Sequence, residues 1–572
     1  MKQGITHTEP LIITKARRIR DQPALGFPNT CRRALCFNLG VSMRPIVAAL
    51  LLSLGIACQP ALSQTQNPPP PEPQTESGQQ QTPAPETQKP SEEKSKGVDR
   101  QAEKKITPQE AQELFNSVDE ILKFASQQSG LPIKHEVKHK LTSRDEVEKF
   151  VEQRMKEDPD NKRMEQSEFV MKKFGLLPTD FNLRKFMVAM LREQVAGYYD
   201  TKTKTMNMLD WLPPEVQKPV MAHELTHALQ DQYTDLEKWQ NGGKPEGKKY
   251  SLPEQLALDE LRVARQSVTE GQAMLVLIDY SLVPMGRSAA DAPDAVKMME
   301  DQMMDAAGSP VFASAPLYIK RAMMFAYREG TEFEEQVLRA QGKDAAFKGT
   351  LDTPPADTRE VMQPRQYLNG KHIPLLTVPN FDKLLGKSWE QMDFGALGQF
   401  DVNVLMELYA DADTSRDLTP GWRGGYYYAA RKKGSPSDSV AFIYVSRWSD
   451  NDVAAQFARI FTDSWKQRYK SLRAIAAPAD KANAAAGKAP DTIVRKQTDQ
   501  GTVSVERDEN VVIVTESFPD AEAVKLRDAA LAANDGTAKT TLLLQPSGFM
   551  FDFRRYTATD GMMMTPFLRP VK

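Results

Sequence analysis

The sequence predicts an α+β protein with two folded regions, and three observations support this expectation. Between about residues 106 and 380, long segments repeat apolar residues every three to four positions, the period of an amphipathic helix. The segment 194–208 has short alternating runs on both sides of a polar turn, which predicts a β-hairpin. From about 385 to 572, strands and helices are interleaved, which predicts a smaller α+β region without an obvious catalytic motif.

The composition is that of a folded chain with a mildly acidic body. The 572 residues are 40% hydrophobic, which is enough to bury a substantial core and to build more than one domain. The formal charge is −2, but residues 1–63 are basic, and the remainder carries 66 basic and 74 acidic residues, a net charge of −8. This balance argues against a nucleic-acid partner.

Residues 1–63 have the pattern of a leader that ends in an export signal. From Met43, a single arginine precedes the apolar run 46–57, which is too short to span a bilayer and is typical of a signal-peptide core. We therefore expect Met43 to be the true start. We expect the protein to be exported to the periplasm or cell envelope, or secreted.

Two processing sites compete in this leader. Ala61 and Ser63 suit an ordinary signal peptidase. Cys58 follows the residues LGIA, which resemble a lipoprotein box and would attach the chain to a membrane through a lipid. All three cysteines (Cys31, Cys36 and Cys58) lie in the leader, so disulfides and a cysteine nucleophile are excluded from the body.

Residues 64–105 separate the leader from the folded regions. They are rich in Pro, Gln, Glu and Ser and contain almost no apolar residues. Such a segment cannot bury enough apolar surface to fold. We therefore predict a disordered linker that tethers the folded part of the chain.

Two segments match the pattern HExxH, in which two histidines one helical turn apart bind zinc. This geometry requires a helix, because only a helix stacks side chains i and i+4 about 5–6 Å apart. In the first segment, residues 135–139, apolar and charged residues alternate with a period of two, and Lys138 would place a cation between the ligands. We therefore expect a strand there and no metal site.

The second segment, residues 223–227, has the features of a metal-binding helix. Pro219 suits a first helical turn, and uncharged residues separate the two histidines. His223 and His227 would each supply an imidazole nitrogen, and Glu224 would take a proton from a metal-activated water. The alternative is a chance match on an amphipathic helix.

A third ligand decides the class of the site. The longer pattern HExxHxxGxxH is excluded, because Gln230 stands in the place of its glycine. Glu270 lies in an otherwise apolar stretch, where a buried carboxylate needs a partner such as zinc. Glu260 is the alternative ligand, but the neighbouring Arg262 and Arg265 favour a solvated ion pair there. We therefore predict Glu270 as the third ligand.

The segment AHELTHALQDQ followed by EGQA is similar to the gluzincin-type zinc metallopeptidases. More narrowly, it resembles a group of largely uncharacterised exported bacterial proteins that share a later segment, PP-x-(S/T)-x-E-x-x-x-P-x-x-Y. Residues 354–367 resemble that segment with one extra residue after Pro355, and they match at the prolines, Thr358, Glu360 and Tyr367, although Asp357 and Gln363 differ from the expected residues. The resemblance covers residues 190–370 and implies a mainly helical, zincin-like metallopeptidase domain with a small hairpin sheet. It implies these roles: His223, His227 and Glu270 as zinc ligands, and Glu224 as the catalytic base.

The sequence departs from the resemblance in one respect and leaves two functions open. The gap from His227 to Glu270 is wider than is usual in thermolysin-like enzymes, and we assign the excess to a polar insertion at 241–249. We expect a hydrolase, an exported zinc-dependent peptidase acting on peptides or proteins. The alternative is a binding or assembly protein of the envelope, on the same scaffold, with little or no turnover.

The residue that stabilises the oxyanion and the role of the hairpin are not fixed by the sequence. Four side chains are candidates for the first role by their place in the sequence: Tyr198, Tyr199, Arg265 and Tyr280. The hairpin at 194–208 is either the edge strand that pairs with an extended substrate or an ordinary part of a sheet.

Overall fold

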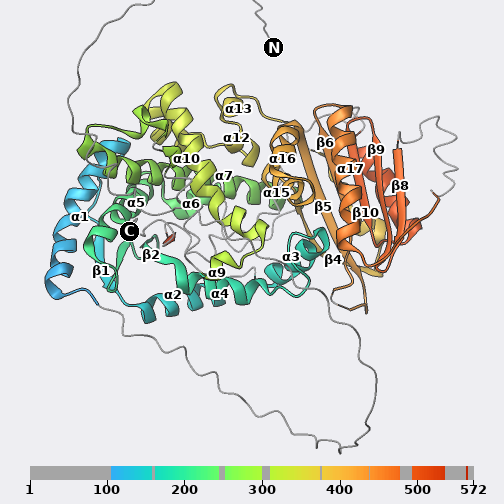
Figure 1. The fold of residues 1–572 in the computed structure, drawn as a ribbon, viewed down its shortest axis with the longest axis horizontal. Helices are drawn as coiled ribbons and strands as arrows, with labels where there is room; N and C mark the ends of the chain where they lie inside the picture. Colours follow the sequence, from blue (N-terminus) through green and yellow to red (C-terminus); the bar gives the residue numbers. More distant parts are fainter. Residues whose placement is uncertain are drawn as a thin grey trace, which may run out of the picture. The chain divides into compact units, whose positions relative to one another are not determined.

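The computed structural model describes residues 105–157, 161–243, 252–294, 296–298, 310–373, 376–436, 438–476, 492–534 and 562–564. These residues form a mixed α and β structure with two sheets (Figure 1). None of the helices within these ranges combines the length and the apolar character needed to cross a bilayer. The predicted signal peptide, the start at Met43, the processing site at Cys58 and nearly all of the predicted linker lie outside the described residues.

Helices make up most of the first predicted region, as the apolar periodicity indicates. In α1, Thr107 and Glu110 form a capping box at the first turn, and Gly130 ends the helix with a φ of 73°. The fully described helices up to residue 352 include α1 (Pro108–Ser129), α2 (Arg144–Glu157), α3 (Asn161–Phe174), α4 (Leu183–Gln194), α5 (Pro214–Thr234), α6 (Leu236–Gln240), α7 (Leu252–Leu282), η2 (Val283–Met285), η3 (Ala289–Asp291), α9 (Pro310–Ala313), α10 (Leu317–Gln341), η4 (Ala345–Gly349) and α11 (Thr350–Asp352).

The first sheet has the strand order β1-β3-β2-β11. β2 (Val195–Asp200) and β3 (Thr205–Leu209) form the predicted antiparallel hairpin. β1 (Lys138–Thr142) pairs with β3 in parallel, so the first HExxH segment is confirmed to be non-helical, although the strand begins only at Lys138 and His135 precedes it. β11 (Met562–Met564) pairs antiparallel with β2 and covers the edge that faces away from β3.

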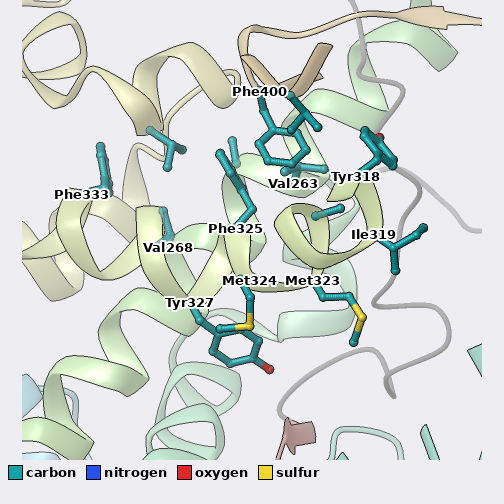
Figure 2. Close-up of a cluster of buried hydrophobic side chains, with 14 of the residues drawn as sticks. Val263, Val268, Tyr318, Ile319, Met323, Met324, Phe325, Tyr327, Phe333 and Phe400 are labelled. Atoms are coloured by element: carbon teal, nitrogen blue, oxygen red, sulfur yellow. The ribbon is translucent and has the colours of Figure 1, made fainter. Parts of the chain in front are cut away.

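The helices α7 and α10 pack against each other at very short range. A Cβ atom built on Gly271 would lie 2.2 Å from the carbonyl oxygen of Gly330, and one built on Gly330 would lie 2.3 Å from the carbonyl oxygen of Ser267. Neither glycine can therefore carry a side chain without moving a helix. Figure 2 shows the apolar side chains around this contact, with Phe325 directed toward Phe400 on one side of α10. The crossing holds the segment of α7 that follows Glu270 close to α10.

The second sheet is an antiparallel sheet with the order β4-β5-β6-β10-β9-β8-β7. Its strands are β4 (Trp389–Ala396), β5 (Trp422–Lys432), β6 (Ala441–Trp448), β7 (Leu472–Ala474), β8 (Thr492–Thr498), β9 (Gly501–Asp508) and β10 (Val511–Glu516). The described helices after residue 352 are α12 (Thr358–Met362), α13 (Pro364–Leu368), α14 (Phe381–Leu385), α15 (Gln399–Tyr409), α16 (Ala412–Leu418), η5 (Thr419–Gly421), α17 (Asn451–Arg468) and α19 (Asp520–Ala533).

Both faces of this second sheet are buried. Tyr427 of β5 belongs to the same buried cluster as Phe457 of α17, whereas Tyr426 on the opposite face belongs to the cluster that contains Leu526 of α19. Since successive side chains of a strand point to opposite faces, α17 and α19 cover opposite faces of the sheet. This arrangement confirms the predicted mixture of strands and helices in the second region.

The two predicted regions share buried contacts. One hydrophobic cluster runs from Leu114 to Val514 and draws on both, and the division near residues 380–385 stays a prediction. Glu260 of α7 is part of the junction, because its Oε2 accepts hydrogen bonds from the amide and the hydroxyl of Thr358, at 2.7 and 2.9 Å. The predicted solvated ion pair at Glu260 is therefore wrong: this carboxyl group is fully buried and joins α7 to α12.

Candidate metal centre

The second HExxH segment lies in α5, which is the central helix of its region. Residues 220–231 are all buried, because α1, α7 and the hairpin contact this helix. His223 and Glu224 have no exposed surface, and His227 retains 1%. A helix surrounded in this way shows little amphipathic patterning, so its polar residues must find partners inside the protein.

The structure brings His223, His227 and Glu270 together as a buried group that can hold a metal ion. The two Nε2 atoms are 3.1 Å apart, and Oε2 of Glu270 lies 3.2 Å from His223 Nε2 and 3.5 Å from His227 Nε2. A tetrahedral ion with bonds of about 2.0–2.1 Å holds its ligand atoms roughly 3.4 Å apart. The spacing of the three donor atoms therefore fits one ion bound by all of them.

The charges of the three groups are strongly coupled. Burial raises the pKa of Glu270, but the two histidines lower that pKa by more, to about 2. Burial lowers the pKa of His227, but the carboxylate of Glu270 raises it to about 9. Burial also lowers the pKa of His223. Glu270 is thus an anion at neutral pH, and this anion favours a positive charge between itself and the two rings.

Gln230, one turn after His227, fixes the orientation of that histidine. Nδ1 of His227 lies 2.8 Å from Oε1 of Gln230. The amide nitrogen of Gln230 donates to the carbonyl of Thr269, at 3.0 Å, and to Oε1 of Gln272, at 2.9 Å, so its oxygen faces the ring. An oxygen acceptor at Nδ1 keeps the proton on that nitrogen and leaves the Nε2 lone pair for a metal.

Gln272, two residues after the third ligand, extends this chain of hydrogen bonds. Its side-chain nitrogen donates to the carbonyl groups of Ala346 and Phe347, at 3.0 and 2.9 Å, and lies 2.9 Å from the hydroxyl of Thr350. The residues EGQA therefore have separate tasks. Glu270 faces the histidines, Gly271 permits the crossing with α10, and Gln272 anchors α7 to the segment that follows α10.

Asp231 and Gln232 connect the same helix to the first sheet. Asp231 accepts a hydrogen bond from the hydroxyl of Tyr199, at 2.9 Å, and forms an ion pair with Lys204, at 2.7 Å. Gln232 accepts hydrogen bonds from the amides of Lys134 and His135, at 2.7 and 3.0 Å. The last three residues of the segment HELTHALQDQ therefore all form hydrogen bonds within the protein: Gln230, Asp231 and Gln232.

Glu224, the predicted catalytic base, is held by the hairpin. Its Oε2 accepts a hydrogen bond from the backbone amide of Tyr199, at 2.9 Å. Its charge contributes to raising the pKa of His227, so the carboxylate lies within electrostatic reach of the metal ligands. One bond to a backbone amide fixes the position of this side chain.

Tyr327 of α10 is a site residue that the sequence analysis missed. Its ring stacks on His223, with the centroids 6.2 Å apart and the planes at 27°. Burial raises the pKa of Tyr327 well above its usual range, and the charges of Glu270 and Glu224 add to this effect. The hydroxyl therefore keeps its proton. In the sequence, Tyr327 is one aromatic residue among many on an apolar helix, so no local signal identifies it.

The earlier candidates for oxyanion stabilisation have other contacts. The hydroxyl of Tyr199 donates to Asp231, and the ring of Tyr198 stacks on Phe150 with centroids 4.8 Å apart. Arg265 lies over the ring of Trp239 and donates to its carbonyl oxygen. Tyr280 makes an edge contact with Phe124, at 5.3 Å.

Comparison with known proteins adds no relative to this picture. No family model, no curated protein and no solved structure matches the chain.

Proposed function

We propose that this chain is an exported, gluzincin-type zinc metallopeptidase. The observation that carries the proposal is that two imidazole nitrogens of α5 and one carboxylate oxygen of α7 lie within 3.1 to 3.5 Å of one another, while α5 also bears Glu224. Zinc is the ion that this donor set favours, because borderline ions are bound by imidazole and carboxylate together. Three protein ligands also leave a fourth position for water or substrate.

The contacts of the residues support the following proposed roles. When bound, a zinc ion supplies Lewis-acid activation of a water molecule and of the scissile carbonyl group. Glu224, held by the amide of Tyr199, accepts a proton from the attacking water and delivers it to the leaving amine. Tyr327, which stays protonated beside His223, donates a hydrogen bond to the oxygen on which negative charge develops.

The proposal is tested by measuring zinc content and peptide cleavage in the processed full-length chain and in Glu224→Gln. We expect one zinc per chain in both proteins, because Glu224 is not a ligand, and cleavage that falls by at least about a hundredfold in the variant. A wild type that binds no zinc, or a variant as active as wild type, would refute the peptidase. Stoichiometric zinc without any Glu224-dependent cleavage would favour the binding or assembly protein instead.

A further inference from the structure

The C-terminal strand β11 lies on the strand that holds the catalytic glutamate. Met562 is paired with Tyr198, Met563 with Gly197 and Met564 with Val195, and the register shifts between the last two pairs. β11 also contacts α5, the helix that carries both histidine ligands. A segment distant in sequence from residues 190–370 is therefore part of the surroundings of the metal centre.

The pairing uses the edge of β2 that faces the metal centre. The amide of Tyr199 points to Glu224 and hence away from β3. Since backbone amides alternate between the two edges of a strand, Gly197 presents its N–H and C=O groups to the same edge as Tyr199. Met563 is opposite Gly197, so β11 occupies the edge beside Glu224.

This edge is the only one on which β2 can accept another chain. Its other edge is paired with β3, in a register that runs from Tyr198 with Asn207 to Asp200 with Thr205. A peptide that binds by strand addition makes main-chain hydrogen bonds along an exposed edge. Such a peptide and β11 require the same backbone groups of β2 and cannot be bound together.

We propose that β11 is a tethered competitor that blocks the peptide-binding edge of β2 and must leave before an extended peptide enters. The inference rests on the proposed function, since that function gives the edge its substrate. β11 is only three residues long and irregular in register, so it makes few main-chain hydrogen bonds. A tether raises its effective concentration to roughly the millimolar range, which allows a weak strand to exclude a free peptide.

The sequence of the competitor indicates the chemistry of the peptide that replaces it. The strand consists of three methionines, which are apolar and carry no charge. A peptide that pairs with the same edge is extended, and the composition of the strand that it replaces favours an apolar one. The class of ligand is therefore an apolar polypeptide segment.

The test measures access to the edge without relying on catalysis. The probe is a fluorescent synthetic peptide with the sequence of residues 556–570, and its binding to full-length chains that carry Glu224→Gln is followed by anisotropy. Met563→Pro removes the N–H that faces Gly197, whereas the matched control Met562→Pro removes an N–H that alternation directs away from β2. We expect Met563→Pro to bind the probe at least about tenfold more tightly than the parent chain or the control.

A second measurement uses the peptide in place of a protein variant. A probe methylated on the nitrogen of Met563 should lose binding to the Met563→Pro chain, and one methylated on Met562 should keep it. Equal binding of the probe to all three chains, or equal binding of the two methylated probes, would overturn the proposal. If the probe binds as expected but the wild-type chain cleaves no peptide, the inference about β11 is supported and the proposed peptidase function is refuted.

Discussion

At the scale of single residues, Tyr327 is the side chain that the structure adds to the predicted site. It lies on the side of α10 opposite Phe325 (Figure 2), and its ring stacks on His223. We expect Tyr327→Phe to keep its zinc and to lose about a hundredfold or more in kcat, because one hydrogen bond to the oxyanion is removed. Metal analysis and steady-state kinetics would measure both quantities.

The matched control for this prediction is on the same helix. Tyr318→Phe also removes a buried hydroxyl, which donates to Asp401 at 2.9 Å, and Tyr318 lies nine residues before Tyr327 on α10, about 13 Å along the helix. Its effect should fall on stability and leave kcat within about threefold of wild type, as expected for a change away from the reacting atoms. An equal loss of kcat in both variants would show that Tyr327 has only a structural role.

At the same scale, the sequence was sufficient to predict the three residues that the structure brings together as a possible metal site, but not the side chains that support them. His223, His227 and Glu270 were identified because ligand spacing on a helix and a lone carboxylate in an apolar run are local patterns. Gln230 and Gln272 bond across two helices, so their partners are unknown until α5 and α7 are placed. Glu260 was misread for the same reason: its partner, Thr358, is 98 positions away.

At the scale of elements, the glycines at the crossing of α7 and α10 set how closely these two helices approach each other beside Glu270 of α7. A methyl group on Gly271 would lie 2.2 Å from the carbonyl oxygen of Gly330, which is backbone and cannot rotate away. We expect Gly271→Ala to lower the free energy of unfolding by about 1–3 kcal/mol and to weaken zinc binding, because the helices must separate. Urea unfolding and zinc titration would measure the two effects.

Gly349 provides the control for this substitution. It is also helical, but its added methyl group would meet neighbours at 3.6 and 3.8 Å, which is ordinary contact. Gly349→Ala should be neutral or stabilising by up to about 1 kcal/mol, because it restricts the unfolded chain. If Gly271→Ala is equally harmless, the close crossing does not exist in solution.

The periodicity of apolar residues predicted helices and strands, but it did not predict which of these elements pack or pair with each other. The helical character of the region from about 106 to 380 and the hairpin at 194–208 were expected, and the structure has both. The parallel pairing of β1 with β3 was not expected, because no local pattern encodes the partner of a strand. β11 was missed because three methionines do not alternate with polar residues.

At the scale of the whole molecule, buried carboxyl groups at the junction near α12 make stability depend on pH. Burial raises the pKa of Asp357 to about 7, and the charge of Glu360 acts in the same direction. An unfolded aspartate has a pKa of about 3.9, so the stability that the neutral group provides is complete below that value and is lost as the pH rises to about 7. The free energy of unfolding should fall over this range.

The variant Asp357→Asn isolates this contribution. Asparagine keeps the oxygen that caps α12, where Oδ1 of Asp357 accepts the amide of Glu360 at 2.8 Å, but it cannot ionise. We expect the stability difference between variant and wild type to shift in favour of the variant from pH 4 to pH 7. Chemical denaturation of both zinc-free proteins would measure it, and parallel pH profiles would contradict the assignment.

The position of β11 also has a consequence for how the chain is made. The ribosome synthesises Met562–Met564 after every other described strand, so the first sheet stays incomplete while the rest of the protein emerges. An uncovered strand edge invites pairing with other nascent chains. β11 thus acts as a late cover for this edge, and a truncated product that lacks it would be prone to aggregate although His223, His227 and Glu270 are intact.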